Sequence, residues 1–292
     1  MNAKVSISKR AGASFPVRRM NFNFDTVPEY WMGGNAGLTH FMTALSALFP
    51  AGEKFFIDSV RAVRYHSMLK NNADLQKEIS AFIGQEAMHT HEHVGFNASA
   101  QKFGHDVDAL ERHTDTVIQT TRKFMAKLAK PIGITQEMVD LTTTTALEHF
   151  TATIASQLLS NSHIQELMTD DTMKTMWLWH AIEENEHKAV VFDVYTAMYG
   201  RGLKAYGMRA TAMILAMTLI FITQSYFTAQ LMKTDRKLTW KDSKYMLKFM
   251  YGRQGFITRQ IPELLDFFRP NFHPNDSNTD QLLAEWKLKL GF

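Results

Sequence analysis

Apolar side chains recur every three or four residues along most of the chain, which is the period of amphipathic α-helices. The 7 prolines and 15 glycines punctuate the chain between these periodic stretches. The pattern therefore predicts an all-α fold that follows an irregular segment over residues 1–36. The long helices are expected over residues 37–69, with a break or kink at Pro50, and over residues 74–103, 108–130, 135–160 and 170–199.

The order of these helices indicates how they pack. Two helical hairpins joined by a long crossover, formed by the helix over residues 108–130, are the simplest arrangement. This arrangement matches the ferritin-like variant of the four-helix bundle. We therefore predict a bundle over residues 37–200 and a C-terminal extension with additional helices over residues 201–292.

An uncharged run over residues 210–232 lies within this extension. As a helix its 23 residues would be roughly 35 Å long, which is enough to cross a bilayer. Seven Thr, Ser and Gln residues lower the hydrophobicity of the run, and only residues 212–222 are densely apolar. A buried bundle helix, an interfacial helix and a membrane-spanning helix therefore all stay open. We expect a cytoplasmic protein with a candidate membrane surface at residues 210–232.

Composition limits the chemistry. Lys and Arg total 32 and Asp and Glu total 29, and the resulting net charge of +3 gives no indication of a nucleic-acid partner. Cysteine is absent, which excludes disulfides, thiolate-bound metals, iron–sulfur clusters and cysteine nucleophiles. Any metal must therefore be bound by Glu, Asp or His. The basic residues Lys4, Lys9 and Arg10 precede no apolar run, so no secretory signal is expected and the cytoplasm is the default location.

Four of the predicted helices place a glutamate on a face that should be buried. In the helix over residues 74–103, Glu86 follows Ile79 and Phe82 at helical spacing. An ionised carboxylate at such a position is costly unless a positive charge pairs with it. The corresponding glutamates of the other helices are Glu53, Glu148 and Glu184.

Two of these glutamates begin Glu-x-x-His pairs, Glu86–His89 and Glu184–His187. Composition alone would give about 0.6 such pairs, so the pairs by themselves are weak evidence. Glu53 precedes the first pair by 33 positions and Glu148 precedes the second by 36, and each gap is the length of one helical hairpin. A Glu from each of two helices and a Glu-x-x-His from each of the other two form the ligand set of dinuclear carboxylate sites in helical bundles.

Such a site would hold two divalent ions. Residues i and i+3 project from one helical face, so Glu and His can reach the same ion. Four carboxylates offset the four positive charges, and oxygen together with imidazole ligation favours two Fe ions, with Mn or Zn as alternatives. The competing interpretation is that these side chains pair with Arg61, Arg64 or Lys188 on wetter faces.

Several short stretches carry a resemblance to known proteins. They are Arg18–Phe22, Phe49–Phe56, Gln85–His89, Leu147–Phe150, Trp179–Lys188 and Phe268–Pro274. On these stretches the chain resembles the ferritin-like di-iron carboxylate superfamily, and more closely a bacterial family labelled predicted metal-dependent hydrolase. The resemblance covers most of the chain, implies a metal site and leaves the reaction open.

Further histidines and aspartates are candidates for the same site. His180 lies one turn before Glu184, and the pattern His-x-x-x-Glu-x-x-His is similar to the seven-ligand site of the di-iron arylamine N-oxygenases. That resemblance implies a seventh ligand at His180, and a core or supporting histidine is the alternative. His93 lies one turn beyond His89 and is expected beside the ligands or on the substrate side. Asp58 and Asp193 are candidates to orient ligand histidines through the ring nitrogen that does not bind metal.

Three functions fit these residues. The first is an oxidoreductase in which two ferrous ions use O2 to oxidise a hydrophobic organic substrate, with electrons from an unidentified donor. The second is a hydrolase that attacks an ester or phosphoester with metal-activated water. The third is a non-catalytic, iron-handling bundle. The Glu-rich ligand set favours the di-iron oxidase, the 21 Phe and 18 Met residues suit an apolar cavity, and the oligomeric state stays open.

Overall fold

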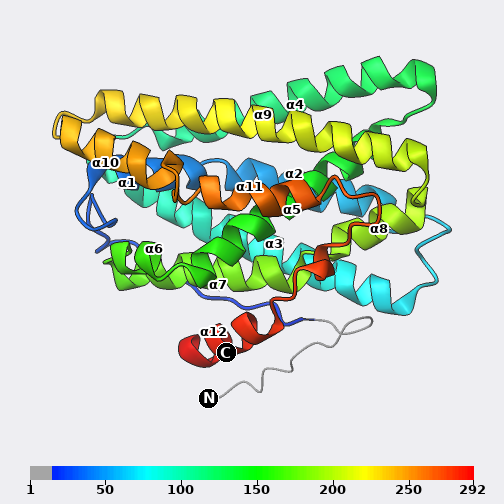
Figure 1. Cartoon of the computed structure of the whole chain (residues 1–292), viewed down its shortest axis with the longest axis horizontal. Coiled ribbons are helices and arrows are strands. Elements are labelled where there is room, and N and C mark those ends of the chain that lie inside the picture. The colour runs from blue at the N-terminus through cyan, green and yellow to red at the C-terminus, as the bar shows by residue number, and fades with distance from the viewer. Residues whose placement is uncertain (1–14) are drawn as a thin grey trace.

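The computed structural model describes residues 15–292, and these residues form helices and connecting segments without a β-strand (Figure 1). The predicted all-α class is confirmed. Residues 1–14 of the N-terminal segment, with Lys4, Lys9 and Arg10, lie outside the described residues. Residues 15–35 of that segment form no helix.

The α-helices of the described part carry the labels of Figure 1. They are α1 (Ala36–Ser46), α2 (Phe49–Val63), α3 (Ala73–Ala100), α4 (Val107–Ala129), α5 (Gln136–Ser160), α6 (Ser162–Leu167), α7 (Asp171–His187), α8 (Val190–Tyr199), α9 (Leu203–Thr234), α10 (Trp240–Tyr251), α11 (Ile261–Asp266) and α12 (Asp280–Leu290). Short 3₁₀ turns follow α3 and α4 and precede α11 and α12.

The first predicted helix is divided near Pro50. Pro50 lies in the first turn of α2, where its missing N–H costs nothing, so the chain breaks between α1 and α2. α2 ends at Val63, earlier than the predicted residue 69, and turns lead from there to α3. The break at this proline is therefore confirmed, and the predicted end of the helix was too late.

The predicted helix over residues 170–199 is also divided. α7 ends at His187 and α8 begins at Val190, so the prediction of one continuous helix was wrong. No proline or glycine marks this division in the sequence. At the break, the Lys188 ammonium donates to the Ser277 carbonyl oxygen at 2.6 Å and to the Thr279 hydroxyl at 3.0 Å. Such long-range contacts have no signature in the local hydrophobic pattern.

Two helical hairpins form the centre of the molecule. α2 packs along α3, and α5 packs along α7 and α8. The two hairpins meet where α2 contacts α5 and where α3 contacts α7 and α8. α4 connects α3 to α5 and packs against both α2 and α5 (Figure 1). The interface between the hairpins holds most of the buried charged side chains described below.

The N-terminal segment lies along α3. The backbone N–H groups of Asn21 and Phe22 donate to the buried Glu92 carboxylate at 2.8 and 3.1 Å. Close approach requires glycine: a Cβ on Gly84 would lie 2.6 Å from Val17 Cγ2. The segment therefore reaches the middle of the bundle even though it forms no helix of its own.

α9 contains the uncharged run of residues 210–232 and covers one long side of the bundle in Figure 1. One stripe of it, including Met213, Ala216 and Phe227, is buried against α1 and α5. Only 22% of its most apolar stretch is buried, however, so α9 is not a buried bundle helix. By length and composition alone it could cross a membrane, which is weak evidence of membrane association.

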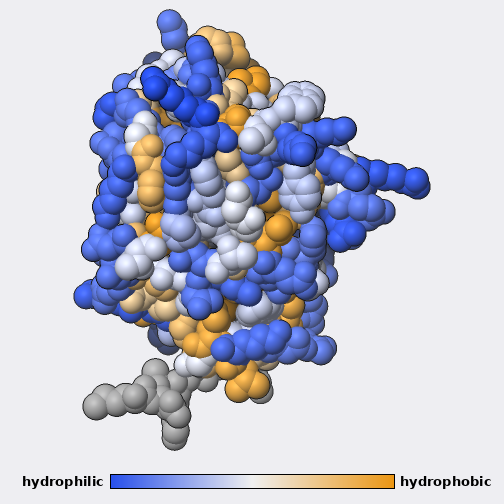
Figure 2. All heavy atoms as spheres, turned by 90° about the vertical axis from the view of Figure 1, so that its left-hand side faces the viewer, coloured by the Kyte–Doolittle hydropathy of each residue, from blue (hydrophilic) through white to orange (hydrophobic). Residues whose placement is uncertain are grey.

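The outer face of α9 remains apolar. Ile214, Phe221 and Ile222 are each 58% exposed. Figure 2, which views the left-hand end of Figure 1, shows hydrophilic side chains over most of that end, with apolar side chains at both its upper and its lower edge. The long side of the molecule at α9 therefore carries exposed apolar surface.

Candidate metal centre

The four glutamates on apolar stripes converge between the two hairpins. Glu53 comes from α2, Glu86 from α3, Glu148 from α5 and Glu184 from α7. Each is at most 3% exposed. The helical periodicity that placed each of them on a dry face also brings them to one point, because these four faces form the interface of the bundle. Their role as metal ligands stays a prediction.

The side chains form overlapping groups with spacings that suit metal ions. One group contains Glu86, Glu148, Glu184 and His187, and each contributes a ligand atom within 4.8 Å of the others. Further groups with the same spacing are Glu53–Glu86–His89 and His89–His180–Glu184. Glu86 and Glu184 thus belong to groups that contain His187 and to groups that contain His89. Shared carboxylates of this kind are able to bridge two ions.

Unsatisfied polar atoms concentrate at the same place. In the described part of the chain, 14 buried side-chain nitrogen or oxygen atoms make no hydrogen bond, and 8 of them belong to this cluster. These are Oε1 of Glu53, both carboxylate oxygens of Glu86 and of Glu148, Oε2 of Glu184, Nδ1 of His89 and Nε2 of His187. Leaving such atoms buried without a partner is costly. The donor set therefore fits bound cations.

The pKa shifts within the cluster also indicate that it lacks positive charge. Burial, reinforced by the nearby charge of Glu86, raises the pKa of Glu53 and of Glu148 well above its usual value. Burial also opposes ionisation of Glu184, but the charge of His187 and the close approach of the surrounding histidines hold the pKa of Glu184 well below its usual value. The histidines therefore stabilise the ionised form of Glu184, whereas Glu53 and Glu148 lack enough nearby positive charge to favour ionisation.

Each histidine of the two pairs is held through one ring nitrogen. His89 Nε2 donates to Glu183 Oε2 at 3.1 Å, and His187 Nδ1 donates to Gln85 Oε1 at 2.9 Å. The opposite nitrogens point at carboxylates: His89 Nδ1 lies 3.5 Å from Glu184, and His187 Nε2 lies 3.1 Å from Glu86. Metal-binding histidines are oriented in this way by a carboxylate or carbonyl behind the ring.

Comparison with known families bears directly on the reaction. Residues 16–278 match the model of a family described as "Predicted metal-dependent hydrolase". The chain belongs to this family. No curated protein and no solved structure gives a significant match. Membership of this family of predicted metal-dependent hydrolases contradicts the expected di-iron oxidase and supports the hydrolase alternative.

The oxidase was inferred from the types of ligand, and this is why the inference failed. The same carboxylate and imidazole atoms can hold a divalent ion that acts as a Lewis acid or one that changes oxidation state. Together with the buried Glu and His groups, the family supports divalent metals in general. These groups do not distinguish iron from other divalent ions.

In this member of the family, Arg18 links the groups that hold the two histidines. Its guanidinium donates to Glu183 at 2.9 Å and to both oxygens of Glu186 at 2.8 and 2.9 Å. Gln85 Nε2 donates to the same Glu186 carboxylate at 2.7 Å. Although burial opposes ionisation, the hydrogen bond and charge of Arg18, with the charge of Lys287, hold the pKa of Glu186 below its usual value. One arginine of the N-terminal segment therefore supports both sides of the cluster.

His180 lies against the cluster, in contact with His93. His180 Nε2 is 2.9 Å from Glu184 Oε1 and 3.8 Å from Glu53 Oε1. Its Nδ1 is 2.8 Å from His93 Nε2. Burial, with the charge of His89, lowers the pKa of His180 to about 4. His180 is therefore a neutral imidazole whose tautomer depends on His93.

Hydrogen bonds beyond His93 fix that tautomer. Asn97 Nδ2 donates to Glu111 at 2.6 Å, so its Oδ1 must accept, and it does so from the Ser46 hydroxyl at 2.7 Å. With its proton used, Ser46 accepts from His93 Nδ1 at 2.8 Å. His93 Nε2 then accepts from His180 Nδ1, which leaves the Nε2 lone pair of His180 directed at the carboxylates. A lone pair in that position favours a cation between His180 Nε2 and the carboxylates of Glu184 and Glu53.

The structure does not bring Asp58 and Asp193 to the cluster. Asp58 is paired with Lys54 on the outer face of α2, and Asp193 accepts from His273 Nε2 at 2.9 Å. Side chains missed in the sequence take the expected orienting role, namely Gln85, Glu183 and, behind them, Arg18. Gln85 and Glu183 each directly precede a predicted ligand, and that adjacency is the signal that could have found them.

The competing interpretation, in which basic residues neutralise these glutamates, finds no support in the contacts. Arg64 donates to Gln76 and Ser80, and Lys188 donates to the C-terminal tail. Arg61 is exposed on α2. Arg64 and Lys188 are therefore hydrogen-bonded to other groups, and Arg61 is exposed to solvent.

Proposed function

We propose that this chain is a hydrolase whose active site holds two divalent ions inside a ferritin-like arrangement of two helical hairpins with α4 as the crossover. The observation that carries the proposal is the group of eight unpartnered donor atoms at one buried point in a member of this family. The ligands would be Glu53, Glu86, His89, Glu148, Glu184 and His187, with His180 as the seventh. The oxygen-rich set favours Fe or Mn over Zn.

When bound, the ions would supply Lewis acidity that polarises a carbonyl group and acidifies water. The residues of the chain prepare the site for this. Thr90 donates to Glu53 Oε2 at 2.8 Å, which leaves Oε1 of the same carboxylate free. Glu183 and Gln85 hold the two histidine rings in place. In ester hydrolysis, the oxygen of water bonds to the acyl carbon, the ester C–O bond breaks, and one water proton passes to the departing alcohol.

Metal removal tests this function. We expect about two ions per chain by elemental analysis of the purified protein. Chelation should abolish the hydrolysis of carboxylic esters, and anaerobic addition of Fe²⁺, Mn²⁺ or Zn²⁺ should restore it although no O2 is present. Full ester hydrolysis by metal-free protein, or a purified protein that binds no metal, would contradict the proposal.

We also propose that the exposed face of α9 rests on a membrane surface. On α4, Phe124 and Leu128 are also apolar, are 62% and 64% exposed, and alternate with exposed lysines of the same helix. Apolar side chains beside lysines suit an anionic bilayer surface. Because the opposite face of α9 is packed on α1 and α5, the interfacial alternative is favoured over a spanning helix.

Binding to vesicles that contain an anionic phospholipid tests this association. The double substitution Phe221→Ser and Ile222→Ser should lower vesicle binding by about tenfold or more, because each apolar side chain contributes up to about 1.5–3 kcal/mol when buried. Val94→Ser, which changes an exposed apolar residue on α3, serves as the control. Equal binding by all three proteins would exclude this face of α9 as the contact.

A further inference from the structure

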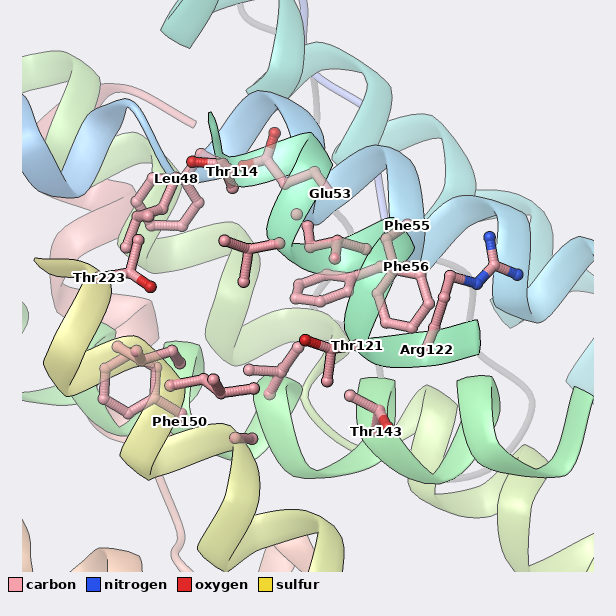
Figure 3. Close-up of a pocket in the computed structure, with 18 of the residues that line it drawn as sticks. Leu48, Glu53, Phe55, Phe56, Thr114, Thr121, Arg122, Thr143, Phe150 and Thr223 are labelled. Carbon is pink, nitrogen blue, oxygen red and sulfur yellow. The ribbon is translucent and has the colours of Figure 1, made fainter. Parts of the chain in front are cut away.

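An apolar cavity adjoins the metal centre. It lies between α2, α4, α5 and α9, and its empty volume, including the opening to solvent, is about 990 Å³. The volume within it that a water-sized molecule can occupy is about 160 Å³, close to that of an engineered apolar cavity that binds benzene. Its wall includes Phe55, Phe56, Leu147 and Phe150, with Glu53 at one edge (Figure 3). Glu53 therefore belongs both to the cavity and to the cluster of candidate ligands.

α4 and α9 line one side of the cavity. The lining residues Thr121 and Met125 on α4 and Leu219 and Thr223 on α9 are only half-buried, whereas Glu53 is 1% exposed. A molecule that enters between these two helices would therefore meet Glu53 on the inner wall. The candidate metal centre lies immediately behind it.

The wall offers few groups for a polar ligand. The hydroxyls of Thr114, Thr143 and Thr151 donate to carbonyl oxygens of their own helices, at 3.0, 2.9 and 3.1 Å. Arg122 is bound by the Asp140 carboxylate. Apart from Glu53 and the hydroxyls of Thr121 and Thr223, the described lining presents methyl groups, aliphatic chains and aromatic rings. A ligand with polar groups along its length would lose hydrogen bonds to water here without replacing them.

We infer that this cavity holds the aliphatic chain of the substrate, so that the substrate class is a carboxylic ester with an aliphatic acyl chain and its ester group beside Glu53. The inference rests on the proposed hydrolase function for the reaction and on the cavity for the chain. Burial of apolar area drives such binding, and it is worth about 0.8 kcal/mol per methylene, or about fourfold in affinity.

Two measurements on the full chain as purified test the inference. The first is kcat/KM for a series of esters from butyrate to dodecanoate, kept below the concentration at which they aggregate. We expect an increase of up to about fourfold for each added methylene until the cavity is filled. The second is calorimetric titration with methyl ketones of matching chain length, which the protein cannot hydrolyse, and their affinity should rise with chain length in the same way.

A substitution inside the cavity supplies the structural test. Thr121 projects into the cavity from α4 (Figure 3), so Thr121→Trp should fill part of it. We expect the preference for dodecanoate over butyrate to fall by about tenfold or more, the equivalent of two or more methylenes. Thr121→Phe should give a smaller loss. Thr120→Trp places the same side chain on the exposed neighbouring position and should leave the preference unchanged.

The outcomes separate the cavity from the reaction. If no ester is cleaved but ketone affinity rises with chain length and falls in Thr121→Trp, the cavity assignment stands and the hydrolase proposal fails. If esters are cleaved without dependence on chain length and Thr121→Trp changes neither rate nor ketone affinity, the cavity assignment is overturned and the hydrolase proposal stands.

Discussion

Replacing Glu148 by alanine should abolish binding of the metal pair and lower ester hydrolysis by more than about 100-fold. Both carboxylate oxygens of Glu148 are buried without a hydrogen-bond partner, and they lie in the same ligand group as Glu86, Glu184 and His187. Loss of a residue that only supports a metal ligand typically costs about 10–100-fold in metal affinity or activity, so loss of a ligand should cost more. Elemental analysis and the ester assay measure the two effects.

Thermal unfolding gives an independent test of Glu148→Ala. Metal that binds only the folded protein stabilises it, so chelation should lower the Tm of the wild-type protein. The variant should unfold at a temperature that chelation hardly changes. Glu137→Ala, which removes an exposed glutamate from the same helix, should bind metal as the wild type does. Unchanged metal content in Glu148→Ala would show that the ligand assignment is wrong.

The helices were predictable because their apolar period is local. The pattern located α3, α4 and α5 to within a few residues, and the effect of Pro50 on the start of α2 follows from its missing N–H. The division between α7 and α8 was missed because no breaker marks it. The exposure of α9 was left open for a related reason: a helix that is apolar on most sides has no face that composition assigns to solvent.

The candidate site, like the fold, was predictable from the sequence only in part. Glutamates on apolar stripes are visible in the sequence, because a buried carboxylate without a partner is anomalous. The arrangement behind the ligands was not visible, since Arg18 lies in a segment without periodicity and reaches α7 only in three dimensions. The ring nitrogen that His180 directs at the carboxylates depends on Ser46 and Asn97, which are far from it in the chain.

The reaction was beyond what ligand types can decide, but the surroundings of the site add information. The apolar cavity was anticipated from the abundance of Phe and Met, and it lies beside Glu53. An apolar route to the site suits an ester with an aliphatic chain as well as it would suit the substrate of an oxidase. The proposed reaction therefore rests on family membership, and the proposed substrate class rests on the cavity.

Replacing Arg18 by alanine should have the largest effect of any change outside the ligand groups. Arg18 neutralises the buried carboxylates of Glu183 and Glu186, and its side chain is 9% exposed. Breaking a buried ion pair by removing one partner costs about 3–5 kcal/mol. We expect the lower end, about 3 kcal/mol of unfolding free energy, because Glu183 keeps His89 and Glu186 keeps Lys287. Chemical denaturation measures this loss.

Metal affinity distinguishes a supporting role at the site from a general loss of stability in Arg18→Ala. Without Arg18, the side chains of Glu183 and Glu186 are free to shift. Glu183 holds His89, and Glu186 accepts from Gln85, which holds His187, so both histidines would be less well oriented. Metal affinity should therefore fall by about 10–100-fold at a temperature where the variant is folded. Arg18→Lys should recover part of both losses, since an ammonium keeps the charge but not the paired hydrogen bonds to Glu186. Arg19→Ala removes the neighbouring exposed arginine and should change neither quantity. A destabilised Arg18→Ala that binds metal as tightly as the wild type would limit Arg18 to holding the N-terminal segment.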